Sequence, residues 1–262
     1  MSEPARCAGV PEARREPSLR RYPLRRLRLP VGAGQLSLVV PDEAAWVRGG
    51  TWAPDVVRGK EPPYWIRIWP AALAAARTID RGGDLSGLQV LDLGCGLGVP
   101  GVAAARAGAS VTFADLEQDA LAFAAWNARN QPGADSEPAV VQIDWSQATT
   151  AGAFDLVVMS DVSYRERHHE PLRAHLREVL APGGVALHAD PLRELATAFL
   201  SSLADEYVTA CWTRPTVIQD RRADVRLTLI AREAAALDAA VCRFGESSAR
   251  GAYRDGGGAP PA

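Results

Sequence analysis

A short apolar stretch that ends in three alternate glycines constrains this chain more than any other feature. Val90-Leu91-Asp92-Leu93 runs into Gly94-Cys95-Gly96-Leu97-Gly98, and the spacing predicts a helix from about Val99. Glycine accepts positive φ and lets a ligand lie against bare main chain. The first amides of a helix present the positive end of its dipole to such a ligand. The stretch therefore predicts a ligand-binding turn between a buried strand and a helix.

Strands and helices alternate along most of the remaining chain. Helices are expected at 70–80, 99–107, 117–130, 170–180 and 192–203, and strands at 35–40, 90–93, 110–114, 139–143, 154–159, 185–189, 207–213 and 225–231. Apolar strands in this alternation predict a parallel sheet that helices cover on both faces. The 262 residues are enough for one such α/β domain with tails.

Composition divides the chain into four parts. Residues 1–30 are rich in Arg and Pro and predict a flexible arm; a transit peptide is the alternative, which the glutamates and prolines suit poorly. Residues 31–70 hold a strand and an aromatic segment that forms either a plug over the sheet edge or a lid over a pocket. Residues 71–232 form the main domain, and residues 233–262 predict a disordered tail.

Polar residues follow the predicted parallel strands at the point where each strand ends. These residues are Gly94, Asp115, Asp144, Asp161 and Asp190. In a doubly wound sheet the ligand binds at the carboxyl ends of the strands. Acidic groups that recur at this one edge are hard to explain by core packing, so they predict a binding site there.

Two acidic residues narrow the class of ligand. Asp92 is expected to place a negative charge beside the glycine turn, which suits a cationic ligand such as S-adenosylmethionine (SAM). Asp115 ends the second strand, where an acidic residue accepts the hydroxyls of a ribose. Gly96–Gly101 also matches the G-x-G-x-x-G loop of nicotinamide dinucleotide sites. Its first glycine, however, would lie two residues further past the end of the strand than in such sites, and Pro100 removes an amide from the start of the helix. The residues favour SAM over NAD.

The glycine stretch resembles the first motif of the seven-strand, class I SAM-dependent methyltransferases. Four further features resemble the protein-lysine methyltransferase branch that includes the electron transfer flavoprotein β-subunit lysine methyltransferase and its bacterial relatives: Pro63-Tyr64-Trp65 with Trp69-Pro70, Asp144-Trp145, Ser160-Asp161-Val162-Ser163-Tyr164, and Asp190-Pro191. The resemblance covers about residues 35–232. It implies a Rossmann-like doubly wound seven-stranded sheet that is mostly parallel, with an antiparallel C-terminal strand and a short N-terminal extension.

The same resemblance implies roles for individual residues. It assigns the binding of SAM to Trp69, Asp92, Gly94, Gly96, Gly98, Asp115, Leu116, Asp144, Trp145 and Ser160. It assigns catalysis to Asp161 and Tyr164, which would face the methyl acceptor; Asp161 could instead be a plain helix N-cap. The Asp161–Tyr164 stretch lacks the paired prolines of enzymes that methylate planar amides or base amines, so neither acceptor is expected.

The leading functional prediction is a SAM-dependent N-methyltransferase that acts on a protein lysine. The alternatives are a small-molecule N- or O-methyltransferase and a non-catalytic SAM-binding or partner-binding module.

The net charge of −2 gives no electrostatic case for nucleic acid, and no apolar run suits a membrane span. Four scattered cysteines and the adjacent, presumed solvated His168 and His169 predict no metal site. We expect a cytoplasmic monomer.

Overall fold

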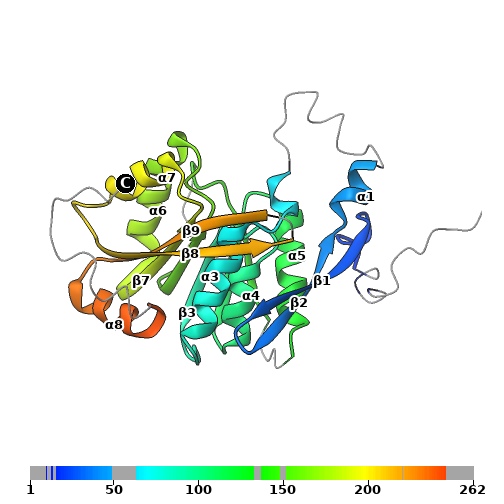
Figure 1. Ribbon diagram of the computed structural model, residues 1–262, viewed down its shortest axis with the longest axis horizontal. Coiled ribbons are helices and arrows are strands. Elements are labelled where there is room, and N and C mark those ends of the chain that lie inside the picture. The colour runs from blue at the N-terminus through cyan, green and yellow to red at the C-terminus, as the bar shows by residue number, and fades with distance from the viewer. Residues whose placement is uncertain are drawn as a thin grey trace, which may run out of the picture.

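The computed structural model describes residues 16–48, 63–132, 137–147, 152–219 and 221–245, together with Val10 and Ala13. It contains a two-stranded hairpin and a seven-stranded sheet with helices packed on both faces (Figure 1). The hairpin consists of β1 (Leu24–Val31) and β2 (Gly34–Pro41), and a short helix, α1 (Glu43–Arg48), follows it.

The large sheet has the strand order β5-β4-β3-β6-β7-β9-β8. The strands are β3 (Gln89–Leu93), β4 (Ser110–Asp115), β5 (Ala139–Gln142), β6 (Phe154–Ser160), β7 (Leu180–Asp190), β8 (Val208–Ile218) and β9 (Arg221–Ala231). The pairings among β5, β4, β3, β6 and β7 are parallel, whereas β9 runs antiparallel to both β7 and β8. This arrangement confirms the predicted fold class and puts β3, with the glycine turn, in the middle of the sheet.

Helices cover the two faces of the sheet. One face carries α3 (Pro70–Arg81), α4 (Val99–Arg106), α5 (Gln118–Arg129) and α8 (Ala234–Phe244), and the other carries α6 (His169–Val179) and α7 (Glu194–Ser201). Side chains along β3 alternate between the two cores, with Val90 in the first and Leu91 and Leu93 in the second. The central strands are apolar along their whole length because both faces of the sheet are buried.

Two predictions about the ends of the chain were wrong for the described residues. The expected flexible arm contains β1, in which Leu24, Leu29 and Val31 are buried and intervening arginines are not. From Leu27 to Val31 the side chains alternate between the core and solvent, and the segment pairs with β2 despite its Arg-rich composition. The expected disordered tail contains α8, which buries Leu237, Ala240 and Phe244 at helical spacing. Residues 1–9 and 246–262, the outer parts of both predictions, lie outside the described structure.

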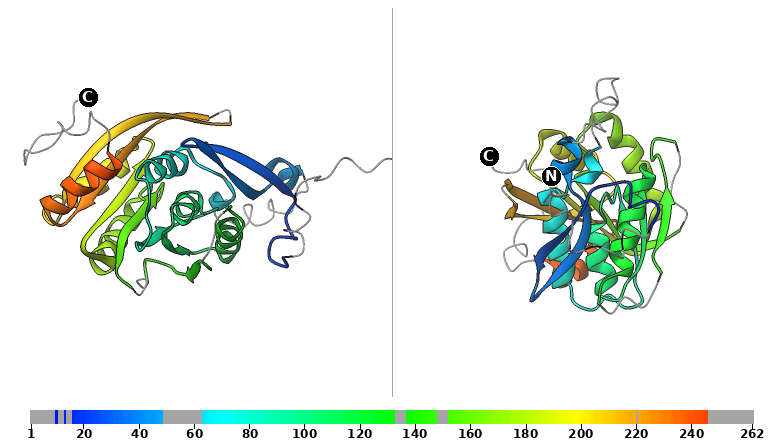
Figure 2. Two further views of the ribbon diagram at one scale, coloured as in Figure 1. Left: turned by 90° about the horizontal axis from the view of Figure 1, so that it is seen from below. Right: turned by 90° about the vertical axis from the view of Figure 1, so that its right-hand side faces the viewer.

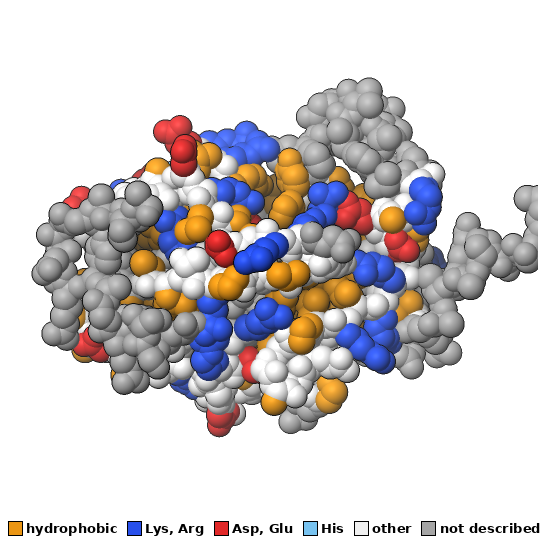
Figure 3. Space-filling view, in the orientation of Figure 1, with side chains coloured by type: hydrophobic (Ala, Val, Ile, Leu, Met, Phe, Trp, Pro, Cys, Tyr) orange, Lys and Arg blue, Asp and Glu red, His pale blue; other side chains and the backbone are white. Residues whose placement is uncertain are grey.

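The last two strands are longer than expected and reach well past the rest of the sheet. β9 pairs with β7 only from Arg226 to Ala231, while its pairing with β8 continues to Ile218 and Arg221. Figure 2 shows this ribbon curving over α3 toward the N-terminal hairpin. Figure 3 shows basic side chains among apolar and acidic ones on this face. None of the helices in the described ranges has the length and apolar character needed to cross a bilayer.

Candidate active site

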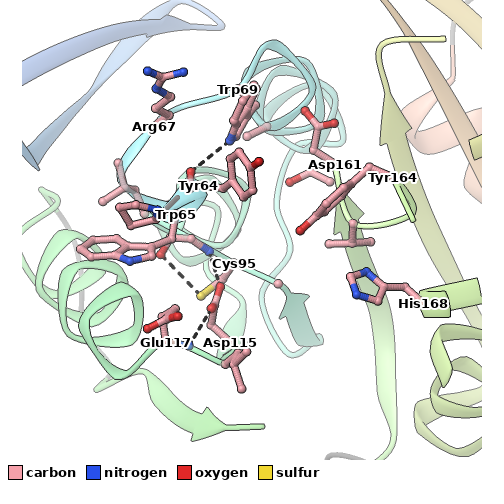
Figure 4. A pocket seen from close by; sticks show the side chains of 18 of the residues that line it. Tyr64, Trp65, Arg67, Trp69, Cys95, Asp115, Glu117, Asp161, Tyr164 and His168 are labelled. Atoms are coloured by element: carbon pink, nitrogen blue, oxygen red, sulfur yellow. Dashed lines mark hydrogen bonds between the residues drawn. The ribbon is translucent and has the colours of Figure 1, made fainter. Parts of the chain in front are cut away.

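A pocket of about 470 Å³ opens at the carboxyl ends of β3, β4, β5 and β6, and the segment before α3 closes one side of it. Its size is within the range of roughly 300–1,000 Å³ that is usual for small-molecule sites. Ten of the twelve sequence-predicted site residues line it: Trp69, Gly94, Gly96, Asp115, Leu116, Asp144, Trp145, Ser160, Asp161 and Tyr164. Figure 4 shows Trp69 and Tyr64 across the pocket from Asp161 and Tyr164.

The glycine turn leaves β3 and wraps over the end of β4. The amides of Gly94 and Cys95 both donate to the Ala114 carbonyl, at 2.8 and 3.1 Å. Gly94 has φ of 69°, and a Cβ there would lie 2.5 Å from Val162 and 3.2 Å from the Trp145 ring. The turn therefore needs glycine at this position, because a side chain would fill the narrow space between the loop and the opposite wall.

Gly98 and Asp92, the other two predicted residues, lie behind the turn and do not line the pocket. Gly98 sits at the N-terminus of α4 with φ of 77°, and a Cβ there would lie 2.7 Å from Ala124. Gly98 thus permits close packing of the turn against α5. Asp92 is fully buried, and its Oδ2 accepts the Gly101 amide at 2.9 Å. It ties the end of β3 to the first turn of α4.

The charge expected of Asp92 is not what its surroundings support. Burial raises the pKa of Asp92 to about 8, so its carboxyl is mostly protonated at neutral pH. Its Oδ1 has no hydrogen-bond partner among the described residues. The argument that a fixed negative charge at this position selects a cationic ligand was therefore wrong, and Asp92 supports the loop from within the core.

Asp115 is the carboxylate at the floor of the pocket. Its Oδ2 accepts the Gly96 amide at 2.8 Å, and its Oδ1 accepts the Glu117 amide at 3.0 Å. Burial raises its pKa, while these backbone amides lower it. Each carboxylate oxygen keeps a second lone pair, so Asp115 can still accept two hydroxyl groups. A ribose is a ligand with two such neighbouring hydroxyls.

Asp144 and Trp145 form the wall beyond Asp115. The Asp144 carboxylate accepts the amide and hydroxyl of Ser146, at 2.9 and 2.6 Å, and these bonds lower its pKa. It therefore shapes the turn after β5. The Trp145 ring stands edge-on to His168, with centroids 5.6 Å apart. His168 in turn stands edge-on to Tyr164 at the same centroid distance, so the expectation of a solvated histidine pair was wrong.

The aromatic segment before α3 forms one side of the pocket, as the lid prediction requires. Tyr64 and Trp65 lie in the short 3-10 helix η2 (Tyr64–Ile66), and Trp69 precedes α3. The Trp69 indole donates to the Tyr64 carbonyl at 3.2 Å, which fixes the two residues together. The Trp65 backbone faces Gly96, where an added Cβ would be 3.5 Å from the Trp65 carbonyl oxygen.

The N-terminal extension holds this lid in place, a role that the sequence did not reveal. Tyr22 stands edge-on to Trp46, Trp65 and Phe123, with ring centroids 5.5 to 5.6 Å apart. Its hydroxyl donates to Asp119 of α5. The extension therefore packs the lid against α5 and against the glycine turn.

A buried asparagine adds polar bonds to this packing. The Asn127 amide exchanges hydrogen bonds with the backbone of Val39 and also donates to the Leu97 carbonyl. It thus links β2, α5 and the turn through three bonds from one side chain. Its only signal in the sequence is a polar residue on the apolar face of a predicted helix.

The opposite wall presents a carboxylate and a phenol. Asp161 follows β6 with φ of 59°, and its amide donates to the Ala189 carbonyl at 2.9 Å. Its side chain is only 7% exposed and is ion-paired with Arg193 through Oδ1, whereas Oδ2 has no hydrogen-bond partner among the described residues. Helices begin at Glu166 and His169, so Asp161 caps neither of them.

Tyr164 completes this wall together with Ser160. Tyr164 stands edge-on to Tyr64 across the opening, with centroids 6.2 Å apart, and its hydroxyl points into the pocket (Figure 4). Ser160 is the last residue of β6 and is buried at the pocket edge. The site thus has two halves, with glycine amides and Asp115 in one, and a carboxylate among aromatic rings in the other.

Comparison with known proteins yields matches to methyltransferases, among them protein-lysine methyltransferases and ubiquinone biosynthesis O-methyltransferases. A family model described as lysine methyltransferase matches residues 65–206. Protein N-lysine methyltransferase METTL21A of Mus musculus is 30% identical over 150 residues, which cover 55% of this chain and 68% of that protein. The electron transfer flavoprotein beta subunit lysine methyltransferase of Mus musculus is 31% identical over 163 residues, which cover 61% and 60%.

Solved structures share the fold at lower identity. The crystal structure of the Pyrococcus horikoshii protein PH1948, named as an RNA methyltransferase, matches with a TM-score of 0.50 and 19% identity. The match covers 66% of this chain and 90% of that one. At this identity the likeness shows the shared architecture alone, since one fold serves many substrates.

Proposed function

We propose that this chain, which belongs to the lysine methyltransferase family, transfers a methyl group to the side-chain amine of a lysine in another protein. The chain is a SAM-dependent methyltransferase. When bound, SAM supplies an electrophilic methyl group on a sulfonium sulfur, and the transfer needs a neutral nucleophile in line with that methyl group. Separate parts of the pocket must therefore bind SAM and the methyl acceptor.

The half of the pocket around the glycine turn suits SAM. Gly94 and Gly96 leave main chain bare at the pocket surface, and Asp115 retains acceptor capacity for two ribose hydroxyls. Leu116 and Trp145 provide apolar surface on which an adenine can lie, and 53% of Leu116 is exposed without a ligand. These residues support the proposal that this half of the pocket binds SAM.

The other half suits a lysine side chain, and the single observation that carries this proposal is Asp161. Asp161 lines a pocket framed by Tyr64, Trp69 and Tyr164, and its Oδ2 is a buried oxygen without a hydrogen-bond partner among the described residues. An amine that enters between these rings gives Asp161 Oδ2 a donor, and the rings exclude water from it. Asp161 is thus placed to accept a hydrogen bond from the amine and to orient its lone pair.

The chemical difficulty for such an acceptor is its proton. A free lysine has a pKa near 10.4, so little of it is neutral at pH 7. The aromatic wall desolvates the amine, which favours the neutral form, whereas a lone carboxylate favours the charged form. The side chains that surround Asp161 therefore decide how well the site generates the nucleophile.

The test is transfer of label from tritiated SAM to protein in a lysate from a strain that lacks this gene. We expect one labelled band with purified wild-type protein and methyl-lysine in its hydrolysate. The Gly96→Arg variant, whose side chain would enter the SAM half of the pocket, should give none. Label confined to the small-molecule fraction would replace the protein acceptor with a metabolite, and no label in any fraction would refute the proposal.

A further inference from the structure

The acceptor carboxylate is held by an arginine that lies outside the lining of the pocket. Arg193, which precedes α7, donates from its guanidinium to Asp161 Oδ1. Its side chain is 36% exposed, so the pair lies at the boundary between the pocket wall and solvent. One oxygen of Asp161 is therefore occupied, and the other is buried with no hydrogen-bond partner among the described residues.

Arg193 is itself fixed by a second, buried ion pair. Its backbone amide donates to Asp190 Oδ1 at 3.1 Å. Asp190 is 1% exposed, and it binds the Arg226 guanidinium of β9 at 3.0 and 3.2 Å. The end of β7 and the middle of β9 thus hold the start of α7 where the Arg193 side chain reaches Asp161.

The backbone on both sides of the pair has an unusual conformation. Asp161 and Leu192 both have φ of 59°, which is uncommon for residues other than glycine. Such strain persists where surrounding structure fixes it, and it is frequent at functional sites. Here the strained residues are Asp161 itself and the neighbour of Arg193.

We propose that Arg193 is a positioning residue for the methyl transfer. Its guanidinium holds Asp161 by one oxygen, and its positive charge balances that carboxylate so that an entering lysine amine is favoured in its neutral form. This inference rests on the proposed function. Without Arg193, the carboxylate would attract the ammonium form and slow the reaction at neutral pH.

Other charged and titratable groups surround the acceptor position. On the same wall and in front of it lie Tyr164, Arg165, His168, Tyr64 and Arg67, and Arg221 stacks on Trp69 from β9. Arg67 is paired with Glu43. The acidic groups Asp115, Glu117 and Asp144 lie toward the SAM half, and His188 and Asp190 are buried behind Asp161. Among the side chains in the described ranges, Asp161 forms an ion pair with Arg193.

The experiment measures the rate of lysine labelling from saturating tritiated SAM between pH 7.5 and 10, above the range in which an ordinary histidine titrates. We expect Arg193→Gln to shift the rising limb of the profile to higher pH by about one unit, the size of a charge interaction over several ångströms near a protein surface. Its rate should be roughly tenfold low at pH 7.5 and should approach that of the wild type at pH 10.

Three control measurements distinguish the positioning role of Arg193 from a general loss of structure. Arg193→Lys keeps the charge and should keep the wild-type profile even if its maximal rate is lower. Arg129→Gln removes an exposed arginine at the far end of α5 and should match the wild type. Calorimetric titration should show unchanged SAM binding by Arg193→Gln. An unshifted profile, or an equal loss at every pH, would overturn the inference; a wild-type enzyme that labels no lysine would refute the proposed function first.

Discussion

Single residues of the glycine turn differ in what they do, although they look alike in sequence. Gly94 borders the pocket, Gly96 faces the lid and Gly98 packs against α5. Three alternate glycines predict a tight turn and the close approach of a ligand, because both features depend only on neighbouring residues in the sequence. Which glycine meets the ligand depends on Val162, Trp65 and Ala124, which come from distant parts of the chain.

We predict that Gly94→Ala lowers the affinity for SAM at least tenfold. The added Cβ would lie 2.5 Å from Val162 in addition to the cost of a left-handed residue, which is roughly 1–2 kcal/mol. Gly83→Ala is the matched control, since Gly83 has φ of 76° and no described atom within 4 Å of the added Cβ. The Gly83→Ala variant should be less stable than the wild type but should bind SAM with the same affinity. Equal SAM affinities of the two variants in calorimetric titration would contradict this account.

Asp92 gives a prediction about stability and pH. Its folded pKa of about 8 is above the unfolded value near 3.9, so the folded state binds an extra proton between these values. Stability from this group is present below about pH 4 and is lost as pH rises to 8. Asp92→Asn keeps an acceptor for the Gly101 amide and cannot ionise.

The variant should therefore gain stability relative to the wild type as pH increases. We expect the difference in unfolding free energy to move by about 2 kcal/mol or more in favour of Asp92→Asn between pH 5 and pH 8. Urea denaturation at the two pH values measures it. A constant difference at both would show that Asp92 is ionised in the folded protein.

At the scale of elements, the sequence predicted the central part of the fold and missed both ends. β3, α4 and α5 were placed within one or two residues because glycines and Pro132 mark their limits. β1 was hidden by its arginines, which occupy the solvent side of an amphipathic strand. α8 was hidden by an Ala-rich composition shared with the tail beyond it. Composition describes the average of a segment, whereas burial depends on the spacing of a few residues.

The site residues at the ends of strands were predictable from the sequence. The residues that act through contacts with distant parts of the chain were not. Asp115, Asp161 and Tyr164 follow strands, so topology alone brings them to one edge. Arg193 and Tyr22 act through partners far away in sequence, and no local pattern marks them. The lid is the clearest example, because its placement depends on the N-terminal extension.

That dependence can be tested with one side chain of the N-terminal extension. Tyr22→Ala removes three ring contacts, with Trp65 of the lid, Trp46 of α1 and Phe123 of α5, and should weaken SAM binding about tenfold, because Trp65 loses support beside Gly96. Tyr22→Phe keeps the rings and loses only the bond to Asp119, so its affinity should stay within about threefold of the wild type. If Tyr22→Ala binds SAM as the wild type does, the N-terminal extension does not hold the lid.

At the scale of the whole molecule, the sheet joins two kinds of site at one edge. The switch in strand order at β3 supplies the SAM half, and the long β7 and β9 strands hold the acceptor half through Asp190 and Arg226. Family membership makes the chain a SAM-dependent methyltransferase, and the buried, half-paired Asp161 supports our proposal of an amine as the acceptor.

The most direct measurement is peptide mass spectrometry of cells with and without this gene. The account predicts at least one lysine that is methylated in the wild type, unmethylated in the deletion strain, and restored by the wild-type gene. Complementation with Gly96→Arg should leave it unmethylated, since that variant blocks the SAM half of the pocket. Identical lysine methylation in all four strains would contradict the central claim that this pocket methylates protein lysine.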